Sequence, residues 1–256
     1  MWNCRELGNQ ATNRELGDFS REKDPSVMFI AETWAVETKL KIIKRSLKFD
    51  RMFSVPRANR GGGPVLFWKD SLNLRVETSS KNHIDRIVGG RIEGAWRFTG
   101  FYGEPITHKR HESWELLRQL HSQFNLPWLC AGDFNEIFRG IEKQGGSNRS
   151  HAPMQLFRDT MDECGFIDMG FKCNPFTWKK YFRDGQTIWE RLDRSLENNE
   201  WLLRFGGSTM HHLTCSTLDH CPLFIVPELL EPANPKKPFC FEETLLAEKG
   251  CSDTVK

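Results

Sequence analysis

The stretch Trp128-Leu129-Cys130-Ala131-Gly132-Asp133-Phe134-Asn135 places an apolar run directly before an aspartate and an asparagine. The run has the length of a buried strand and is too short for a buried helix. Two other apolar runs carry polar residues at their ends: Glu32 closes one, and Asp219 with His220 precedes the other. Because α/β folds build their sites at strand ends, we expect these side chains to belong to one site.

Short apolar runs bounded by turn residues recur along the chain, and segments of helical period lie between them. The expected strands include 27–30, 65–68, 96–101, 127–130 and 223–226, and the expected helices are 11–21, 36–47, 112–124 and 154–164. Two further runs, 176–181 and 187–192, flank a turn that contains Asp184-Gly185, which predicts an antiparallel hairpin. The pattern therefore indicates an α/β protein with mixed sheets.

The chain is long enough for one large domain. Its 256 residues are 38% hydrophobic, including 19 Phe and 9 Trp, which supplies a sizeable core. Pro-rich, apolar-poor sequence follows Pro227, so we expect a domain over residues 1–227 and a linker-like tail over 228–256. The formal charge of +2 excludes a global positive field, so contacts with phosphates must be local.

Compartment and membrane contact are constrained by two further features. No apolar stretch approaches the roughly 20 residues of a bilayer span, and the N-terminal residues lack the apolar core of a secretion signal. The eight cysteines contain no CxxC pair, which favours reduced thiols. We therefore expect a nuclear or cytoplasmic protein that is not secreted and does not contact membranes.

A cation site can be assembled from three of the polar residues. Glu32, Asp219 and Asn3 offer two carboxylates and an amide oxygen. Mg²⁺ takes oxygen ligands and keeps several waters, so this set suffices, and Mn²⁺ has the same preference. Taken singly, a strand-end Asp or Glu more often caps a turn or a helix, so the hypothesis depends on the set.

Two other groups suit acid–base and electrostatic catalysis. Asp133 and Asn135 lie two residues apart, so the carboxylate can orient a water while the amide donates to a phosphoryl oxygen; the alternative is an Asx turn. His220 can stabilise a developing phosphorane, and Asp193 can orient its imidazole by accepting the other N–H. The alternative for His220 is a purely structural role.

The stretch from His211 to Cys221 is rich in histidine and cysteine. Its spacings miss the two-pair pattern of structural zinc sites. We therefore expect no zinc site there.

Six short motifs occur in order along the chain. They are Trp2-Asn3-Cys4-Arg5, Phe29-Ile30-Ala31-Glu32-Thr33, Phe101-Tyr102-Gly103-Glu104-Pro105, Ala131-Gly132-Asp133-Phe134-Asn135-Glu136, Arg191-Leu192-Asp193-Arg194 and Asp219-His220-Cys221-Pro222-Leu223. This order resembles the endonuclease/exonuclease/phosphatase superfamily, close to the endonuclease domains of plant LINE-type (non-LTR) retrotransposons. The resemblance implies a DNase I-like, four-layer αββα sandwich of two mixed β-sheets.

The resemblance also implies a reaction and a metal. A metal-dependent endonuclease of this kind hydrolyses one DNA strand and leaves a 3′-hydroxyl, which primes a reverse transcriptase domain that is absent from this chain. Glu32 would be the main Mg²⁺ ligand, with Asn3 and Asp219 beside it.

The other roles follow from the same resemblance. Tyr102 would support the scissile phosphate or the leaving group. Asp133 and Asn135 would position the attacking water. His220, oriented by Asp193, would stabilise the phosphorane.

Three residues depart from the family pattern. Glu6 stands where Gly is usual, Leu218 stands where a small residue is usual and could displace Asp219 or His220, and Pro64 falls inside an expected strand, which predicts an edge or a bulge. These departures predict a decayed copy with weak activity. Two alternatives stay open: a phosphatase of the same fold that acts on small phosphoesters, and a non-catalytic remnant that binds nucleic acid.

Overall fold

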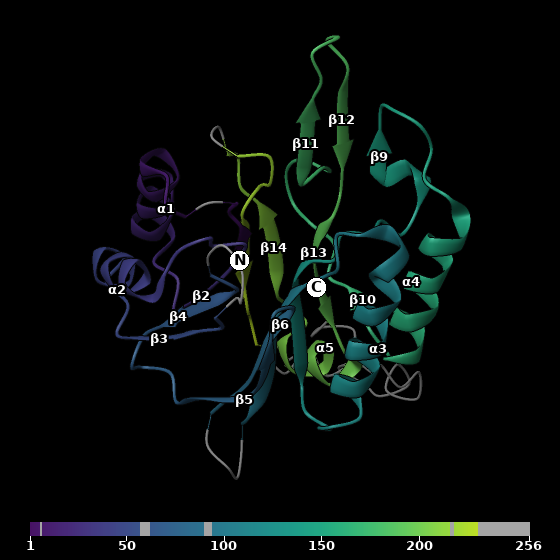
Figure 1. Ribbon diagram of the computed structural model, residues 1–256. Coiled ribbons are helices and arrows are strands. Elements are labelled where there is room, and N and C mark those ends of the chain that lie inside the picture. Colours follow the sequence, from purple (N-terminus) through teal and green to yellow (C-terminus); the bar gives the residue numbers. More distant parts are fainter. Residues whose placement is uncertain (6, 57–61, 90–93, 216–217, 230–256) are drawn as a thin grey trace, which may run out of the picture.

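Two β-sheets lie face to face in the computed structural model, which describes residues 1–5, 7–56, 62–89, 94–215 and 218–229 (Figure 1). The first sheet has the order β1 (Trp2–Asn3), β2 (Val27–Ala31), β4 (Val65–Trp68), β3 (Arg51–Ser54). The second has the order β10 (Ile167–Asp168), β13 (Asp193–Glu197), β8 (Trp128–Asp133), β7 (Trp96–Tyr102), β6 (His83–Val88), β5 (Leu74–Ser80). Both sheets mix parallel and antiparallel pairs.

Smaller elements complete the fold. A hairpin of β11 (Trp178–Tyr181) and β12 (Thr187–Glu190) pairs with β9 (Lys143–Gln144), and β14 (Thr209–His212) pairs with β15 (Leu223–Val226). The helices are α1 (Gln10–Lys23), α2 (Glu37–Ser46), α3 (Arg110–His121), α4 (His151–Glu163) and α5 (Asn199–Phe205), with 3₁₀ turns η1 (Thr107–Lys109) and η2 (Gly140–Glu142). Among the described residues, no helix is both long and apolar enough to span a bilayer.

Alternation along the strands builds the layers. On β2, Met28 and Ile30 pack in a cluster with α1 and α2, whereas Phe29 packs in the cluster between the sheets. On β8, Cys130 packs with α3 and α4, whereas Leu129 faces the first sheet. Successive side chains of a strand point to opposite faces, so each sheet is buried on both sides. The molecule therefore has four layers, in the order α1 with α2, the first sheet, the second sheet, and α3 with α4 (Figure 1). This confirms the predicted αββα sandwich.

One glycine is required by the approach of the two sheets. A Cβ on Gly100 of β7 would overlap the ring of Phe29 on β2. Glycine therefore allows this aromatic ring to pack against the backbone of the opposite sheet.

The predicted helices and the hairpin all exist, with ends displaced by at most three residues. The strands that were not predicted are β3, β5, β6, β9, β10, β13 and β14. On β6 the reason is visible, because Asp85 is fully buried and binds Arg97 of β7, with Nε 2.8 Å from Oδ1. A buried ion pair hides the apolar alternation that marks a strand.

Pro64 lies just before β4, which begins at Val65 between β2 and β3, so it is not at an edge of the sheet. The Pro64 carbonyl accepts the N–H of Val55, and the Val55 carbonyl accepts the N–H of Gly63. Two residues therefore oppose one, which is the pattern of a bulge, the other place that was expected for this proline. Glu6 and most of the expected tail, residues 230–256, lie outside the described residues, so the domain boundary stays a prediction.

Glu197, on β13, provides a pH-dependent contribution to stability. Burial, with a smaller contribution from the charge of Asp168, raises its pKa from 4.5 to about 7. The folded protein therefore keeps a proton that the unfolded chain releases near pH 4.5. This contribution is complete at low pH and is lost as pH rises from about 4.5 to about 7. We expect the free energy of unfolding to fall less between pH 5 and pH 8 in Glu197→Gln than in the wild type, measured by urea unfolding; equal falls would exclude the effect.

Candidate active site

Both sheets deliver polar side chains to the same rim. Asn3 ends β1 and pairs with Ala31, directly before Glu32, while Tyr102 at the end of β7 pairs with Asp133 at the end of β8. Both pairs are parallel, so the carboxyl ends of these strands meet at one edge. The fold thus brings together residues that are far apart in the chain.

Asn3 is the point where three of these residues meet. Its Nδ2 donates to Asp133 Oδ2 at 2.9 Å and lies 3.4 Å from His220 Nε2. The side chain is buried, and its Oδ1 has no hydrogen-bond partner in the described structure. A buried oxygen of this kind indicates a place for a further ligand.

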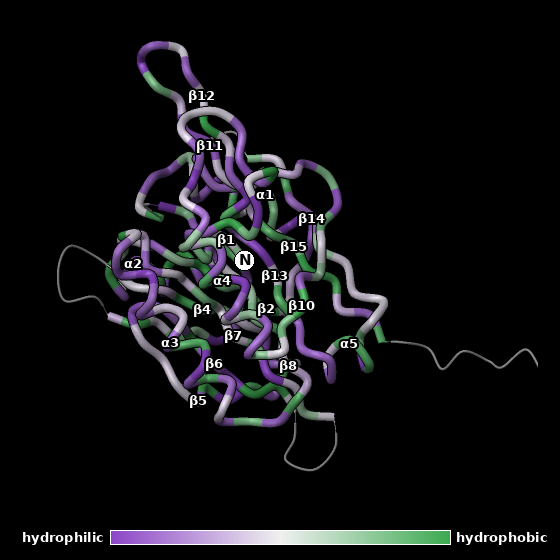
Figure 2. The backbone as a smooth tube through the Cα atoms, turned by 90° about the vertical axis from the view of Figure 1, so that its right-hand side faces the viewer, coloured by the Kyte–Doolittle hydropathy of each residue, from purple (hydrophilic) through white to green (hydrophobic). Residues whose placement is uncertain are grey.

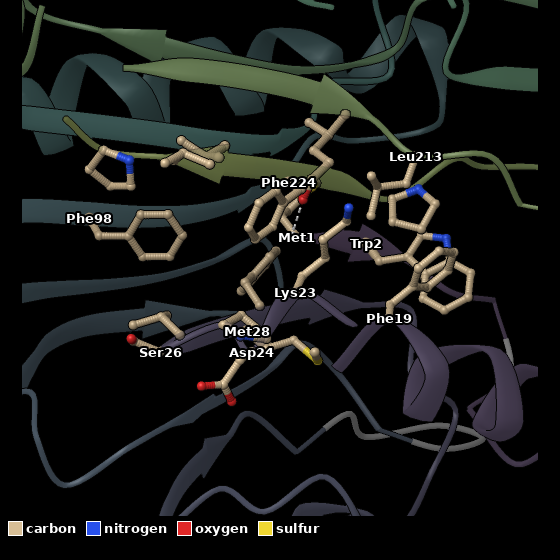
Figure 3. A pocket seen from close by; sticks show the side chains of 18 of the residues that line it. Met1, Trp2, Phe19, Lys23, Asp24, Ser26, Met28, Phe98, Leu213 and Phe224 are labelled. Atoms are coloured by element: carbon tan, nitrogen blue, oxygen red, sulfur yellow. Dashed lines mark hydrogen bonds between the residues drawn. The ribbon is translucent and has the colours of Figure 1, made fainter. Parts of the chain in front are cut away.

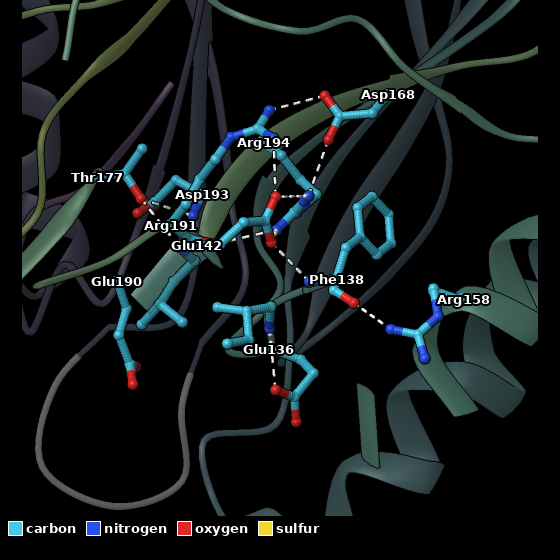
Figure 4. Close-up of polar contacts among 12 residues, drawn as sticks. Glu136, Phe138, Glu142, Arg158, Asp168, Thr177, Glu190, Arg191, Asp193 and Arg194 are labelled. Carbon is cyan, nitrogen blue, oxygen red and sulfur yellow. Dashed lines mark hydrogen bonds and ion pairs between the residues drawn. The ribbon is translucent and has the colours of Figure 1, made fainter. Parts of the chain in front are cut away.

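His220 is held from its other side. Its Nδ1 lies 2.8 Å from Asp193 Oδ2, so the imidazole donates to a carboxylate. Asp193 starts β13, and its backbone N–H and that of Leu192 both donate to Thr177 Oγ1 (Figure 4). The ring is therefore oriented by the carboxylate of a residue whose backbone is held by Thr177.

Two arginines anchor the strand that carries Asp193. Arg194 Nη2 lies 2.9 Å from Glu142 and its Nη1 lies 2.8 Å from Asp168, while Arg191 Nη2 lies 2.7 Å from Asp168 (Figure 4). Asp168 belongs to β10 and Glu142 to η2. Because these groups are largely buried, loss of one partner would leave an uncompensated charge.

The charge states at the centre differ from those of the free side chains. Burial raises the pKa of Asp133 to about 6, against the lowering effect of His220 and of the Asn3 hydrogen bond. For His220, burial lowers the pKa, but the carboxylates of Asp193 and Asp133 outweigh it and raise the pKa to about 10. At neutral pH the site therefore contains an imidazolium 3.7 Å from the Asp133 carboxylate.

The carboxylates expected to bind metal converge on one cationic group. Arg5 Nη1 lies 3.1 Å from Asp219 Oδ2, and Arg5 Nε lies 3.8 Å from Glu32 Oε2. The Arg5 side chain is 56% exposed, so its guanidinium can move into solvent and give up its place between the two carboxylates to another cation. Two carboxylates around one cation, with the unpartnered buried oxygen of Asn3 at the same rim of the sheets, are oxygen donors of the kind that Mg²⁺ takes.

Backbone conformation marks two of the site residues. Glu32 has φ 50° and Asn135 has φ 56°, in the left-handed region that side chains other than glycine seldom adopt. Strained residues of this kind cluster at functional sites. Tyr102 Oη donates to Glu32 Oε1 at 2.5 Å, which orients the carboxylate.

Asp133 and Asn135 form the turn that was considered as the alternative to a catalytic role. The N–H of Asn135 donates to Asp133 Oδ1 at 2.8 Å, which is an Asx-type turn. The other oxygen of Asp133 faces Asn3 and His220. Asn135 Nδ2 donates to the Gly103 carbonyl at 2.9 Å, so its amide is engaged with backbone in this conformation.

Leu218 does not displace its neighbours. It packs against the core cluster that contains Trp2, while His220 keeps its contact with Asp193. Trp2 Nε1 also donates to the His220 carbonyl at 2.9 Å, which ties β1 to this segment.

Sequence reasoning gave no role to several residues that shape the site. Besides Arg5, they include Trp178, whose Nε1 donates to Asp219 Oδ2 at 3.3 Å, and Thr177, which supports Asp193. The position of Arg5 within the first motif was the available signal for it. Among the described residues, Asp133, Asp193 and His220 also form a trio whose possible ligand atoms all lie within 4.8 Å of one another.

A two-sheet sandwich with an Asp–His pair and clustered acids at one rim defines a DNase I-like fold of the nuclease and phosphatase type. The model of the endonuclease/exonuclease/phosphatase family matches residues 2–220, and the chain belongs to this family. No curated protein sequence matches the chain.

Solved structures agree on the fold. The endonuclease domain of TRAS1, a telomere-specific non-LTR retrotransposon, superposes with a TM-score of 0.67 at 13% identity, over 87% of this chain and 95% of that one. An AP endonuclease from Archaeoglobus fulgidus gives 0.67 at 14% identity, over 89% and 97%. The 3′ phosphatase NExo from Neisseria, bound to a product DNA hairpin, gives 0.65 at 14% identity, over 89% and 97%. At such identities the similarity shows the fold alone.

Proposed function

We propose that this chain is a Mg²⁺-dependent phosphodiesterase that nicks one strand of DNA and leaves a 3′-hydroxyl. The observation that carries the proposal is the convergence at Asn3, whose Nδ2 donates to the Asp133 carboxylate and lies 3.4 Å from Nε2 of His220, the partner of Asp193. A base-type carboxylate, an imidazolium and a donor set for a cation then lie in one site, as hydrolysis of a phosphodiester requires.

Glu32, Asp219 and Asn3 would hold the Mg²⁺ ion. When bound, the ion neutralises charge on the leaving oxygen and on the phosphate. Tyr102 keeps Glu32 in position through its hydroxyl. Mn²⁺ is expected to replace Mg²⁺, because both take oxygen ligands.

The protein groups perform the remaining steps. Asp133 accepts the proton of the attacking water, and Asn135 assists in placing that water. His220 faces the developing negative charge of the phosphorane as an imidazolium, and Asp193 keeps its ring in place. Since these groups are prepositioned, catalysis consists mainly of positioning and electrostatic stabilisation.

DNA is favoured as substrate by the hairpin of β11 and β12. Figures 1 and 2 show that it stands out from the body of the molecule. It carries Lys180 and Arg183, and Tyr181 on it is 66% exposed. Its base reaches the site, because Trp178 donates to Asp219. Cations beside exposed aromatic rings suit a polyanion with stacked bases more than a small phosphoester.

Retrotransposition is the biological setting that we propose for this activity. The endonuclease domain of TRAS1, a telomere-specific non-LTR retrotransposon, shares the fold. The nick would then supply a primer to a reverse transcriptase domain, and the protein would act on DNA in the nucleus.

The proposal is tested by nicking of supercoiled plasmid with and without Mg²⁺. Nicked circles that end in a 3′-hydroxyl are expected only with the metal, and DNA polymerase can extend these ends. Hydrolysis of small phosphoesters without nicking would favour a phosphatase. DNA binding without any hydrolysis would favour an inert remnant, consistent with a decayed copy.

The hairpin yields a separate prediction. Replacing Lys180 and Arg183 together by alanine removes two exposed cations, and we expect weaker DNA binding with the slope of log K against log salt reduced by about 2. Fluorescence anisotropy at several salt concentrations measures this. Lys41→Ala, on the outer helix α2, is the matched control. An unchanged slope in the double variant would remove the hairpin from the DNA-binding surface.

A further inference from the structure

Arg5 is an exposed cation that lies between the two carboxylates expected to hold the metal. Its Nη1 lies 3.1 Å from Asp219 Oδ2, and its Nε lies 3.8 Å from Glu32 Oε2. The Arg5 side chain is 56% exposed, whereas those of Asp219 and Glu32 are 25% and 15% exposed. The guanidinium is therefore the part of this cluster that solvent reaches most easily.

Neutral donors hold the same two carboxylates independently of Arg5. Tyr102 Oη donates to Glu32 Oε1 at 2.5 Å, and Trp178 Nε1 donates to Asp219 Oδ2 at 3.3 Å. Both donors remain if the guanidinium moves away, so the carboxylates stay oriented without it. An exposed ion pair contributes little net free energy, because solvent screens it and a long side chain must be ordered to form it. Departure of Arg5 therefore costs little.

A guanidinium and a metal ion compete for the space between Glu32 and Asp219. Both are cations that interact with the same carboxylate oxygens, and like charges at such short range repel each other. Arg5 therefore lowers the affinity of the site for a metal. A phosphate offers the guanidinium another partner, because its planar fork of N–H donors matches two phosphate oxygens.

We propose that Arg5 is a tethered counter-ion that competes with the metal for Glu32 and Asp219 until a DNA phosphate draws it away. This inference rests on the metal site and the DNA substrate of the proposed function. Departure of the guanidinium opens the carboxylates to the metal, so DNA raises the affinity for metal. Because coupling between two binding sites is reciprocal, the metal raises the affinity for DNA by the same factor. The metal therefore binds mainly to the DNA complex.

A purely structural role for Arg5 makes the opposite prediction. If the guanidinium only holds Glu32 and Asp219 in place, its removal weakens metal binding, with or without DNA. If Arg5 competes with the metal, its removal strengthens metal binding in the absence of DNA. The sign of the change therefore distinguishes the two roles, and it is measured without catalysis.

The first experiment titrates the protein with Mn²⁺ in the absence of DNA and measures the free ion by electron paramagnetic resonance. Arg5→Gln is expected to bind Mn²⁺ about tenfold more tightly than the wild type, which is within the usual range of coupling between sites. Arg5→Lys retains the charge and should bind Mn²⁺ nearly as weakly as the wild type. Thermal unfolding in EDTA checks that both variants fold.

Arg51→Gln is the matched control for loss of an exposed, paired arginine. The Arg51 side chain is 64% exposed, and its Nε lies 2.7 Å from Asp70 Oδ1. Arg51 pairs with Trp68, which pairs with Val27 at the other end of β2 from Glu32. This variant should leave Mn²⁺ binding unchanged.

The second experiment repeats the titration with a short DNA duplex, in the His220→Ala background so that the DNA stays intact. DNA should tighten Mn²⁺ binding when Arg5 is present, and Arg5→Gln should reduce this gain by about tenfold. Part of the gain remains, because DNA phosphates also attract the ion directly.

Mn²⁺ binding by Arg5→Gln that equals or falls below that of the wild type would overturn the proposal. An equal gain from DNA with and without Arg5 would also overturn it. Absence of Mn²⁺ binding in every protein would overturn it together with the proposed metal site. Nicking is measured separately: the predicted coupling in a protein that leaves plasmid intact would contradict the proposed hydrolysis and support the role of Arg5.

Discussion

Replacement of Glu32 by alanine is expected to abolish Mg²⁺-dependent nicking, with a loss of roughly 10³-fold or more, which corresponds to several kcal/mol of metal-derived stabilisation. The structure supports this expectation because Glu32 and Asp219 converge on the exposed guanidinium of Arg5. The measurement is the initial rate of conversion of supercoiled to nicked plasmid across a Mg²⁺ titration.

Two controls separate ligand loss from misfolding. Glu37→Ala removes an exposed carboxylate from the first turn of α2 and should leave the rate unchanged. Glu32→Gln retains an acceptor for the Tyr102 hydroxyl but lacks the charge, so it should fold normally and need much more Mg²⁺. Undiminished nicking by Glu32→Ala would remove Glu32 as a ligand.

The second large effect concerns the His220–Asp193 pair. His220→Ala should lower kcat by about 10³-fold, because the group that faces the phosphorane is lost. Asp193→Asn should lower kcat by about 10²-fold to 10⁴-fold, because the amide favours the wrong tautomer and orientation of the ring. Since residues that act as a unit are not additive, Asp193→Asn should have little further effect in the His220→Ala background.

A positioning role for Asp193 also has a spectroscopic signature. Its carboxylate raises the pKa of His220, so Asp193→Asn should lower that pKa, as measured by NMR of the imidazole. Thermal unfolding of each variant controls for stability. Additive losses in the double variant, or an unchanged histidine titration, would contradict the coupling.

Much of the architecture could be predicted from local patterns. Each predicted helix exists, and the apolar runs around residues 27–30 and 127–130 became β2 and β8. The hairpin around Asp184-Gly185 also exists. The missed strand β6 carries Asp85, whose buried ion pair with Arg97 of β7 is satisfied only in the tertiary structure.

The candidate site shows the same division. The order of the motifs was enough to predict Asn3, Glu32 and Asp133 as site residues. It did not predict that Asn3 lies against Asp133 and His220, or that Arg5 lies between two carboxylates. Leu218 was expected to disturb the site. Instead its side chain packs against the core cluster that contains Trp2.

By itself the sequence determined the alternating helices and strands of this protein, since the period of apolar residues along a segment distinguishes a helix from a strand. It also determined which side chains are chemically able to act. Only the tertiary structure decided that Asn3 meets His220 across 217 positions of chain, and that an apolar cavity of about 390 Å³ lies between β2 and β15 (Figure 3). The physical reason is that such contacts depend on how two twisted sheets pack and where their strands end, which no local pattern encodes.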